Sequence, residues 1–121
     1  MKKTFLIGSA ILFISAAYGQ TKINIDSAAK YLGEKVIICS KVYGVKFIES
    51  SKMTFIDLGA KYPASKLTLV IPGKDRNNFK DALEKTYTGK NICVTGTVIN
   101  FKGKTEIVVS APDAITMEKE K

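Results

Sequence analysis

Cys39 and Cys93 are the side chains of this 121-residue chain best suited to covalent chemistry, because two thiols can join in a disulfide bond. Each lies in a segment that begins at a glycine, Gly33 or Gly89, and continues with alternating apolar residues. When the segments are aligned on these glycines, the apolar positions coincide: Val36, Ile38 and Val42 match Ile92, Val94 and Val98. Successive side chains of a β-strand point to opposite faces. The spacing therefore predicts two strands with their apolar residues on one face and both cysteines on the other.

The chain lacks the residue patterns of most catalytic sites. It contains no histidine and one arginine, Arg76, and it has no glycine-rich phosphate loop and no CxxC pair. Asp57 and Glu106 could approach each other on neighbouring elements, but two isolated carboxylates are more typical of a solvated surface. We therefore expect a protein that is not an enzyme, with no cofactor and no metal site.

The first nineteen residues have the pattern of a cleavable signal peptide. Lys2 and Lys3 precede an apolar run over residues 5–17, and Ala17-Tyr18-Gly19 offers small residues where a signal peptidase cleaves. We expect a mature start near Gln20 and a secreted or periplasmic protein, with no membrane span after signal removal. An oxidising compartment favours a Cys39–Cys93 disulfide. The alternative is a pair of free, partly exposed thiols.

Turn residues divide the remaining chain into a short lead-in, one domain and a charged tail. Residues 20–32 form the lead-in, where Asp26 or Ser27 could cap a helical turn, residues 33–115 form the domain, and residues 116–121 are expected to be flexible. Alternating patterns and turn signals predict strands over residues 35–47, 53–58, 66–71, 91–101 and 105–110. A helix is expected over residues 76–85, with Asp75 as its N-cap and an apolar stripe of Phe79, Ala82 and Leu83.

Three strands, a helix and two further strands fit an all-β domain with one helix, in the chain order β-β-β-α-β-β of a five-stranded OB-fold barrel. Closure into a barrel removes the exposed edges of such short strands. Phe79 and Leu83 can plug one end of the barrel, while the small inward positions Ser40 and Gly96 allow strands to bend or bulge. In this topology the first and fourth strands are antiparallel neighbours, so the two cysteines would face each other.

Several stretches also resemble small OB-fold domains of the anticodon-binding-like type, which are found in exported bacterial proteins, alone or beside secreted nucleases. The stretches are Val42-Tyr43-Gly44-Val45-Lys46-Phe47, Thr54-Phe55-Ile56-Asp57-Leu58-Gly59, Lys61-Tyr62-Pro63, Leu69-Val70-Ile71, Asp75-Arg76 and Lys102-Gly103-Lys104-Thr105-Glu106-Ile107-Val108-Val109. They extend over about residues 33–115. The resemblance implies an OB fold and a nucleic-acid-binding role, and it is specific for the fold rather than for a ligand.

The leading functional hypothesis is a binding module for single-stranded nucleic acid or another anionic polymer. The formal net charge is +8, and removal of Lys2 and Lys3 with the signal would leave 17 basic and 11 acidic residues, a charge of +6. OB-folds bind on the outer face of their second and third strands and on the adjoining loops. There, bases could stack on aromatic rings while lysines contact phosphates. The candidate ligand-binding residues are Tyr43, Lys52, Tyr62, Lys102 and Lys104.

Four alternatives remain open from the sequence. Phe47, Phe55 and Phe101 could pack in the core rather than bind, and the basic charge could serve solubility alone. A protein-interaction or envelope-adaptor module without a nucleic-acid ligand would present exposed Val70 and Val108 instead of a basic groove. A small-molecule or sugar sensor would require a pocket.

Overall fold

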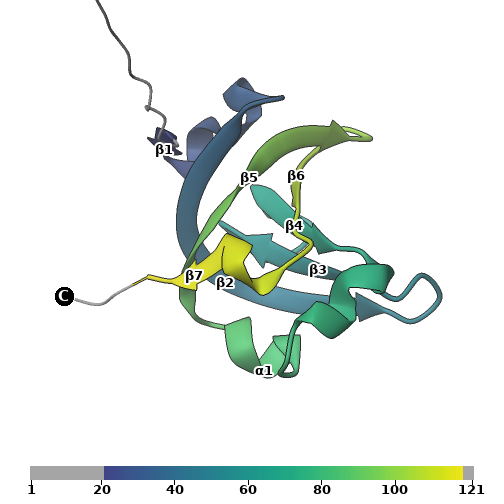
Figure 1. Ribbon diagram of the computed structural model, residues 1–121. Coiled ribbons are helices and arrows are strands. Elements are labelled where there is room, and N and C mark those ends of the chain that lie inside the picture. The colour runs from purple at the N-terminus through teal and green to yellow at the C-terminus, as the bar shows by residue number, and fades with distance from the viewer. Residues whose placement is uncertain (1–20, 119–121) are drawn as a thin grey trace, which may run out of the picture.

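The computed structural model describes residues 21–118, in which seven strands pair into one sheet (Figure 1). The strands run in the order β1-β2-β3-β4-β6-β5-β7. Their bounds are β1 Thr21–Ile23, β2 Lys35–Ile48, β3 Met53–Leu58, β4 Leu67–Ile71, β5 Asn91–Phe101, β6 Lys104–Val108 and β7 Ile115–Met117. The protein is thus mostly β, as its alternating sequence predicts.

The five longer strands, β2 to β6, form a closed circuit of pairings. β2 pairs antiparallel with β3, and β3 with β4; β4 then pairs in parallel with β6, which pairs antiparallel with β5. A further antiparallel pairing between β5 and β2 returns the sheet to its starting strand. Each of the five strands is therefore paired along both of its edges, and the long strands β2 and β5 each bridge two parts of the sheet.

The expected number and order of strands were wrong, because the sheet has seven strands rather than five. The additional strands are β1, which pairs in parallel with β2, and β7, which pairs antiparallel with β5. Each has three residues, too few for a periodic pattern to reveal. β1 lies in the expected lead-in, and β7 spans the expected boundary between domain and tail. The proposed signal peptide lies outside the described residues.

A β-bulge in β2 changes which side chains face the core. The register between β2 and β3 shifts between Val42 and Gly44, so two residues of β2 oppose one residue of β3 at this point. Before the bulge, Val36, Ile38 and Val42 are buried; after it, Val45 packs against the core and Lys46 is exposed. Simple alternation from Val42 would have assigned Lys46 to the core side.

Helical structure is shorter than expected. Instead of one helix over residues 76–85, there is a 3₁₀ helix, η3, over Gly73–Asn78 and a short α-helix, α1, over Leu83–Tyr87. Asp75 lies inside η3 and is not its N-cap, which is Pro72. In the lead-in, the 3₁₀ helix η2 spans Ile25–Tyr31 and is capped by Asn24 rather than by Asp26 or Ser27, and η4 spans Pro112–Ala114. Across residues 21–118, none of the helices has the length and apolar character needed to cross a membrane.

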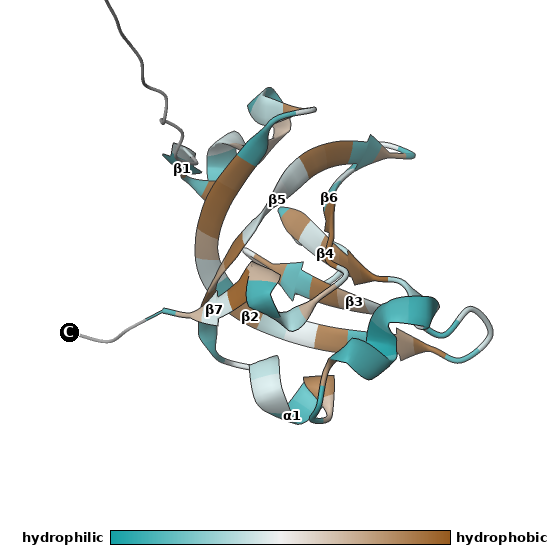
Figure 2. Cartoon of the chain, viewed as in Figure 1, coloured by the Kyte–Doolittle hydropathy of each residue, from teal (hydrophilic) through white to brown (hydrophobic). Residues whose placement is uncertain are grey.

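The core lies inside the circuit of strands, where the inward residues of all five meet. Figure 2 shows hydrophobic bands along these strands and mostly hydrophilic residues on η3. Phe79 and Leu83 are buried against this core, as the sequence predicts, although Phe79 follows η3 and only Leu83 lies in α1. The residues that these five strands contribute to the core cluster are Val36, Ile38, Val42, Ile56, Leu58, Leu67, Leu69, Ile71, Ile92, Val94, Val98 and Ile107.

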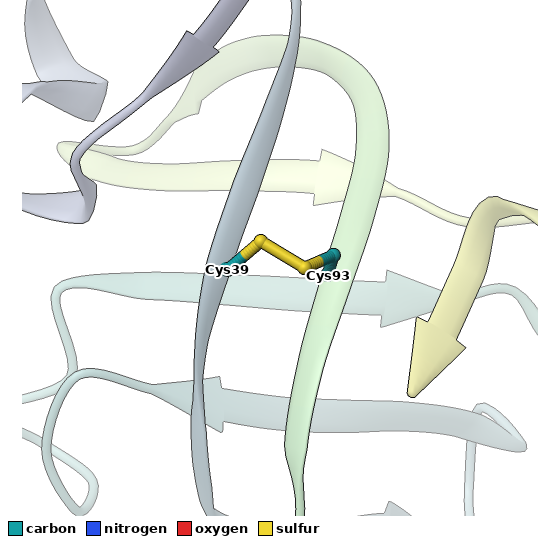
Figure 3. Close-up of a disulfide and its surroundings, with 2 residues drawn as sticks. All are labelled: Cys39 and Cys93. Atoms are coloured by element: carbon teal, nitrogen blue, oxygen red, sulfur yellow. A yellow bond between two sulfur atoms is a disulfide. The ribbon is translucent and has the colours of Figure 1, made fainter. Parts of the chain in front are cut away.

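Cys39 and Cys93 form the expected disulfide across the β2–β5 seam (Figure 3). They are direct partners in the strand register. The Val42 N–H donates to the Lys90 carbonyl, so the next pair along the ladder, Lys41 and Asn91, is a non-hydrogen-bonded pair. The two kinds of pair alternate, so the Cys39–Cys93 pair, two positions further on, is also non-hydrogen-bonded. Side chains approach most closely at such pairs. The alternation of β2 and β5 therefore brings the two sulfur atoms together outside the core, where both residues are half-buried.

Gly96 is required by a close contact inside the circuit. It lies in β5 on the same face as Val94 and Val98, both of which are buried. A Cβ at this position would come within 2.5 Å of Ile107 Cγ2 on β6. The absence of a side chain thus lets β5 and β6 approach, in line with the expectation of a small inward residue here.

Candidate functional site

A groove of about 620 Å³ crosses the outer face of the sheet over β3, β4 and β6. The outward residues of these strands form its floor, and the ends of β2 and β5 with the β3–β4 and β5–β6 turns form its walls. Its volume lies within the range of small-ligand sites. The lining residues are Lys46, Ile48, Met53, Phe55, Asp57, Tyr62, Thr68, Val70, Pro72, Ile99, Phe101, Lys102, Lys104, Glu106 and Val108.

Two exposed aromatic rings border the groove, each accompanied by lysine side chains. Tyr62 is 58% exposed and Phe101 is 52% exposed. The Nζ atoms of Lys104 and Lys46 lie 4.5 and 5.4 Å from the centre of the Tyr62 ring, and Lys102 Nζ lies 5.3 Å from that of Phe101. Cation–π attraction accounts for these positions. The rim of the groove therefore combines flat apolar surfaces with positive charge.

Most of the groove lining is apolar, and one row of polar and acidic residues crosses its floor. Asp57 on β3 is the register partner of Thr68 on β4, and Thr68 is in turn the partner of Glu106 on β6, so the three form one row across the sheet. All three are buried, and the Thr68 hydroxyl donates to Asp57 Oδ1 over 3.3 Å. Burial raises the pKa of the Glu106 carboxyl, an effect that the positive charge of Lys104 partly offsets.

Three of the five candidate ligand-binding residues come together in the groove, and two lie elsewhere. Tyr62, Lys102 and Lys104 line it. Tyr43 lies at the bulge of β2, where Lys41 Nζ is 5.4 Å from its ring centre. Lys52 lies in the β2–β3 turn, where it forms an exposed ion pair with Glu49 over 3.4 Å. Neither Tyr43 nor Lys52 lines the groove.

Several groove residues escaped the sequence reasoning. Lys46 was missed because the bulge that turns it outward leaves no clear signal in the sequence. Glu106 and Asp57 were expected on a solvated surface, but both are buried. The expectation that Phe101 could pack in the core was also wrong, because this residue is half exposed. Val70 is buried and only Val108 is exposed, which corrects the patch expected for a protein-interaction module.

Phe47, outside the groove, belongs to a cluster that holds η3 against β3. The Arg76 guanidinium lies 4.3 Å from the centre of the Phe47 ring and donates a hydrogen bond to the Thr54 hydroxyl. Arg76 Nη2 is also 3.9 Å from Glu84 Oε2. Because Thr54 is fully buried, this contact satisfies a polar group that water cannot reach. Arg76 therefore has a structural role.

The described residues offer one group of three potential metal ligands, namely Cys39, Cys93 and Glu118. Both sulfur atoms of this group belong to the disulfide. They are thus not available as thiolates, the form in which cysteine binds metals.

No family model matches the chain, and no curated protein matches it in sequence. Solved structures do share its fold. A putative aspartyl-tRNA synthetase from Leishmania major Friedlin aligns over 94% of this chain with 17% identity and a TM-score of 0.57. The chain spans about a quarter (24%) of that protein's length.

Two further structures have comparable similarity. The OBody AM1L10, solved bound to hen egg-white lysozyme, aligns over 87% of this chain and all of its own, with 13% identity and a TM-score of 0.60. The structure of yeast Stn1 and Ten1 aligns over 84% of this chain and 64% of the matched chain, with 16% identity and a TM-score of 0.56. At these identities the likeness establishes the fold, which is OB-like.

Proposed function

We propose that the protein is an exported, non-catalytic OB-barrel module that binds single-stranded nucleic acid, or another anionic polymer, in the groove. The carrying observation is the rim, where the exposed rings of Tyr62 and Phe101 lie beside the ammonium groups of Lys46, Lys102 and Lys104. Bases would stack on the rings, and the lysines would turn to the phosphates. The disulfide is compatible with export to an oxidising compartment.

The groove also has an extent that suits such a ligand, because it crosses three strands. Its lining holds three lysines against two carboxylates. Each stacked base contributes about 1–3 kcal/mol, and this contribution is insensitive to sequence. Among the solved structures of the same fold, one protein carries the name of a tRNA synthetase, an enzyme that acts on a nucleic acid.

Titration with a fluorescently labelled oligo(dT) at low and high salt tests the proposal. We expect binding at low salt that weakens as salt rises, because each lysine–phosphate contact releases counterions. A variant with Lys102→Gln and Lys104→Gln should lower the slope of log K against log salt by about 1.4, from 0.7 for each contact on a single strand. Absence of binding by the wild type at low salt would contradict the proposal.

The aromatic part of the site has its own variant. Tyr62→Ala should weaken binding by about 5- to 150-fold, which corresponds to one stacked base, and should leave the salt slope nearly unchanged. Lys85→Gln is the matched charge control, because Lys85 is an exposed lysine of α1 that does not line the groove. If Lys85→Gln weakened binding as much as the groove variants, general positive charge rather than the groove would explain the affinity.

A protein-interaction module is the second candidate. Val108, an exposed apolar residue at the edge of the groove, favours it, and one structure of the same fold, the OBody, is solved bound to a protein. Such a module would bind its partner with little dependence on salt. Val108→Asp should then abolish binding, whereas it should weaken oligonucleotide binding only modestly.

A further inference from the structure

Glu106 is a buried carboxylate that lacks a partner within the described chain. Glu106 is 7% exposed and lines the groove. Over residues 21–118, none of the side-chain hydrogen bonds or ion pairs involves its carboxylate. A buried acceptor without a donor is costly. A ligand that brings hydrogen-bond donors to the groove floor would satisfy this group.

The neighbouring polar groups leave Glu106 free to accept. Asp57, at the other end of the row, already accepts from the Thr68 hydroxyl. Lys104 is two residues away on β6, but its ammonium group lies over the Tyr62 ring and makes no ion pair with Glu106 in the described structure. Glu106 is therefore the floor carboxylate that has both oxygens without a donor among the described residues.

The arrangement of charge across the groove selects the kind of ligand. Positive lysines lie at the rim, aromatic rings form the walls, and the carboxylate lies at the floor. A free cation would be repelled by the lysines, and a polyanionic sugar would bring its own carboxylates against Glu106. A nucleotide matches all three layers if its phosphate stays at the rim and the donor edge of its base points inward.

We propose that Glu106 recognises guanine in the bound single strand. This inference rests on the proposed nucleic-acid-binding function. Guanine is the base whose Watson–Crick edge presents two adjacent donors, the N1–H and an N–H of the 2-amino group. The two oxygens of a carboxylate can accept both at once, and hydrogen bonds to a charged group are about twice as strong as neutral ones. In adenine, cytosine and thymine each donor has an acceptor beside it, which would face the second carboxylate oxygen and repel it.

Strands of about nine nucleotides that differ only at the centre test this specificity. Oligo(dT) with a central dT, dG, dA, dC or deoxyinosine is titrated by fluorescence anisotropy at low salt. A good bidentate contact to a base discriminates by a factor of about 5 to 150, so we expect the dG strand to bind tighter than all-dT by such a factor. Deoxyinosine, which lacks the 2-amino group, should fall between them.

Variants of Glu106 show whether this residue is responsible. Glu106→Gln should bring dG and dT strands to within about twofold of each other, and this ratio is the readout because loss of a negative charge in the groove shifts the affinity for every strand alike. Glu106→Asp keeps the carboxylate and should keep part of the preference, which guards against a folding defect in either variant. Glu34→Gln, the same change at an exposed glutamate outside the groove, should retain the full preference.

The outcomes separate this inference from the function on which it rests. Tight binding of every strand without a preference for dG would overturn the role of Glu106 and leave the binding function standing. Retention of the dG preference in Glu106→Gln would likewise overturn the role of Glu106 and leave the binding function standing. Failure of the wild type to bind any strand at low salt would overturn both.

Discussion

Removal of the Cys39–Cys93 disulfide should cost the folded protein about 4 kcal/mol. The bond links residues separated by 54 positions, so in the unfolded chain it closes a loop of that length. In the chain-entropy model the entropy lost by such a loop is about 14 cal/mol/K, which at 25 °C gives close to 4 kcal/mol. A domain of this size has a total stability of about 5–15 kcal/mol. The bond therefore supplies a large share of it.

The fold itself should survive this loss, because strand pairing already holds the two segments together. The β2–β5 register extends from Lys35 to Lys41, with four residue pairs on one side of the cysteine pair and two on the other. We expect Cys39→Ala/Cys93→Ala to keep the wild-type circular dichroism spectrum at low temperature.

Urea denaturation followed by circular dichroism measures the effect. The double variant should unfold at a lower urea concentration, with an m-value equal to or larger than that of the wild type, because an open unfolded chain exposes more surface. Wild type treated with a reductant is the matched control and should behave as the variant does. A loss below about 1 kcal/mol, or a variant without native secondary structure, would refute the argument that the bond acts mainly on the unfolded chain.

Two further changes test other parts of the structure. Gly96→Ala should destabilise the protein by about 1–3 kcal/mol, measured by urea denaturation, because the added Cβ would overlap Ile107. Gly103→Ala is the control, because no atom lies within 4 Å of the Cβ added there. The positive φ of Gly103 gives this control a strain cost of its own. Glu106→Gln should stabilise the protein at neutral pH by about 1 kcal/mol, since a buried charge is removed. Because burial raises the pKa of Glu106 in the folded protein, the contribution of this residue to stability should fall as pH rises above the ordinary glutamate value of 4.5. The advantage of the variant over the wild type should therefore vanish below about pH 4. An advantage that persists in acid would contradict this assignment.

Alternation and turn residues were sufficient to predict the five longer strands and the disulfide. The parity of Cys39 and Cys93 relative to their apolar neighbours is a local property, and a period of two fixes it wherever a strand is regular. The same rule fails where the strand is irregular. The bulge at Val42 reverses the faces of the following residues, and for this reason Lys46 became visible as a groove residue only in the structure.

The candidate site was harder to predict because it depends on contacts between distant segments. Tyr62, Lys102 and Lys104 were identified from residue type and from the usual binding face of the fold. An approach of Asp57 and Glu106 was considered from the sequence, but on a solvated surface; the parallel β4–β6 pairing instead places them at the two ends of one buried row, with Thr68 of β4 between them. Helix boundaries failed for a related reason: residues 79–82 pack as an irregular segment that carries Phe79 inward, although their composition suits a helix.

The two short outer strands have a practical consequence for work with this molecule. β1 joins the sheet at Val36–Ile38 and β7 joins at Ile92–Val94, so both described ends of the chain leave from the region of the disulfide (Figure 1). Phe101, at the groove, is seven residues beyond Val94 along β5, a path of about 20 Å at the usual rise of a strand. A fluorophore, a surface tether or a fused domain attached at either end should therefore leave the ligand face unobstructed.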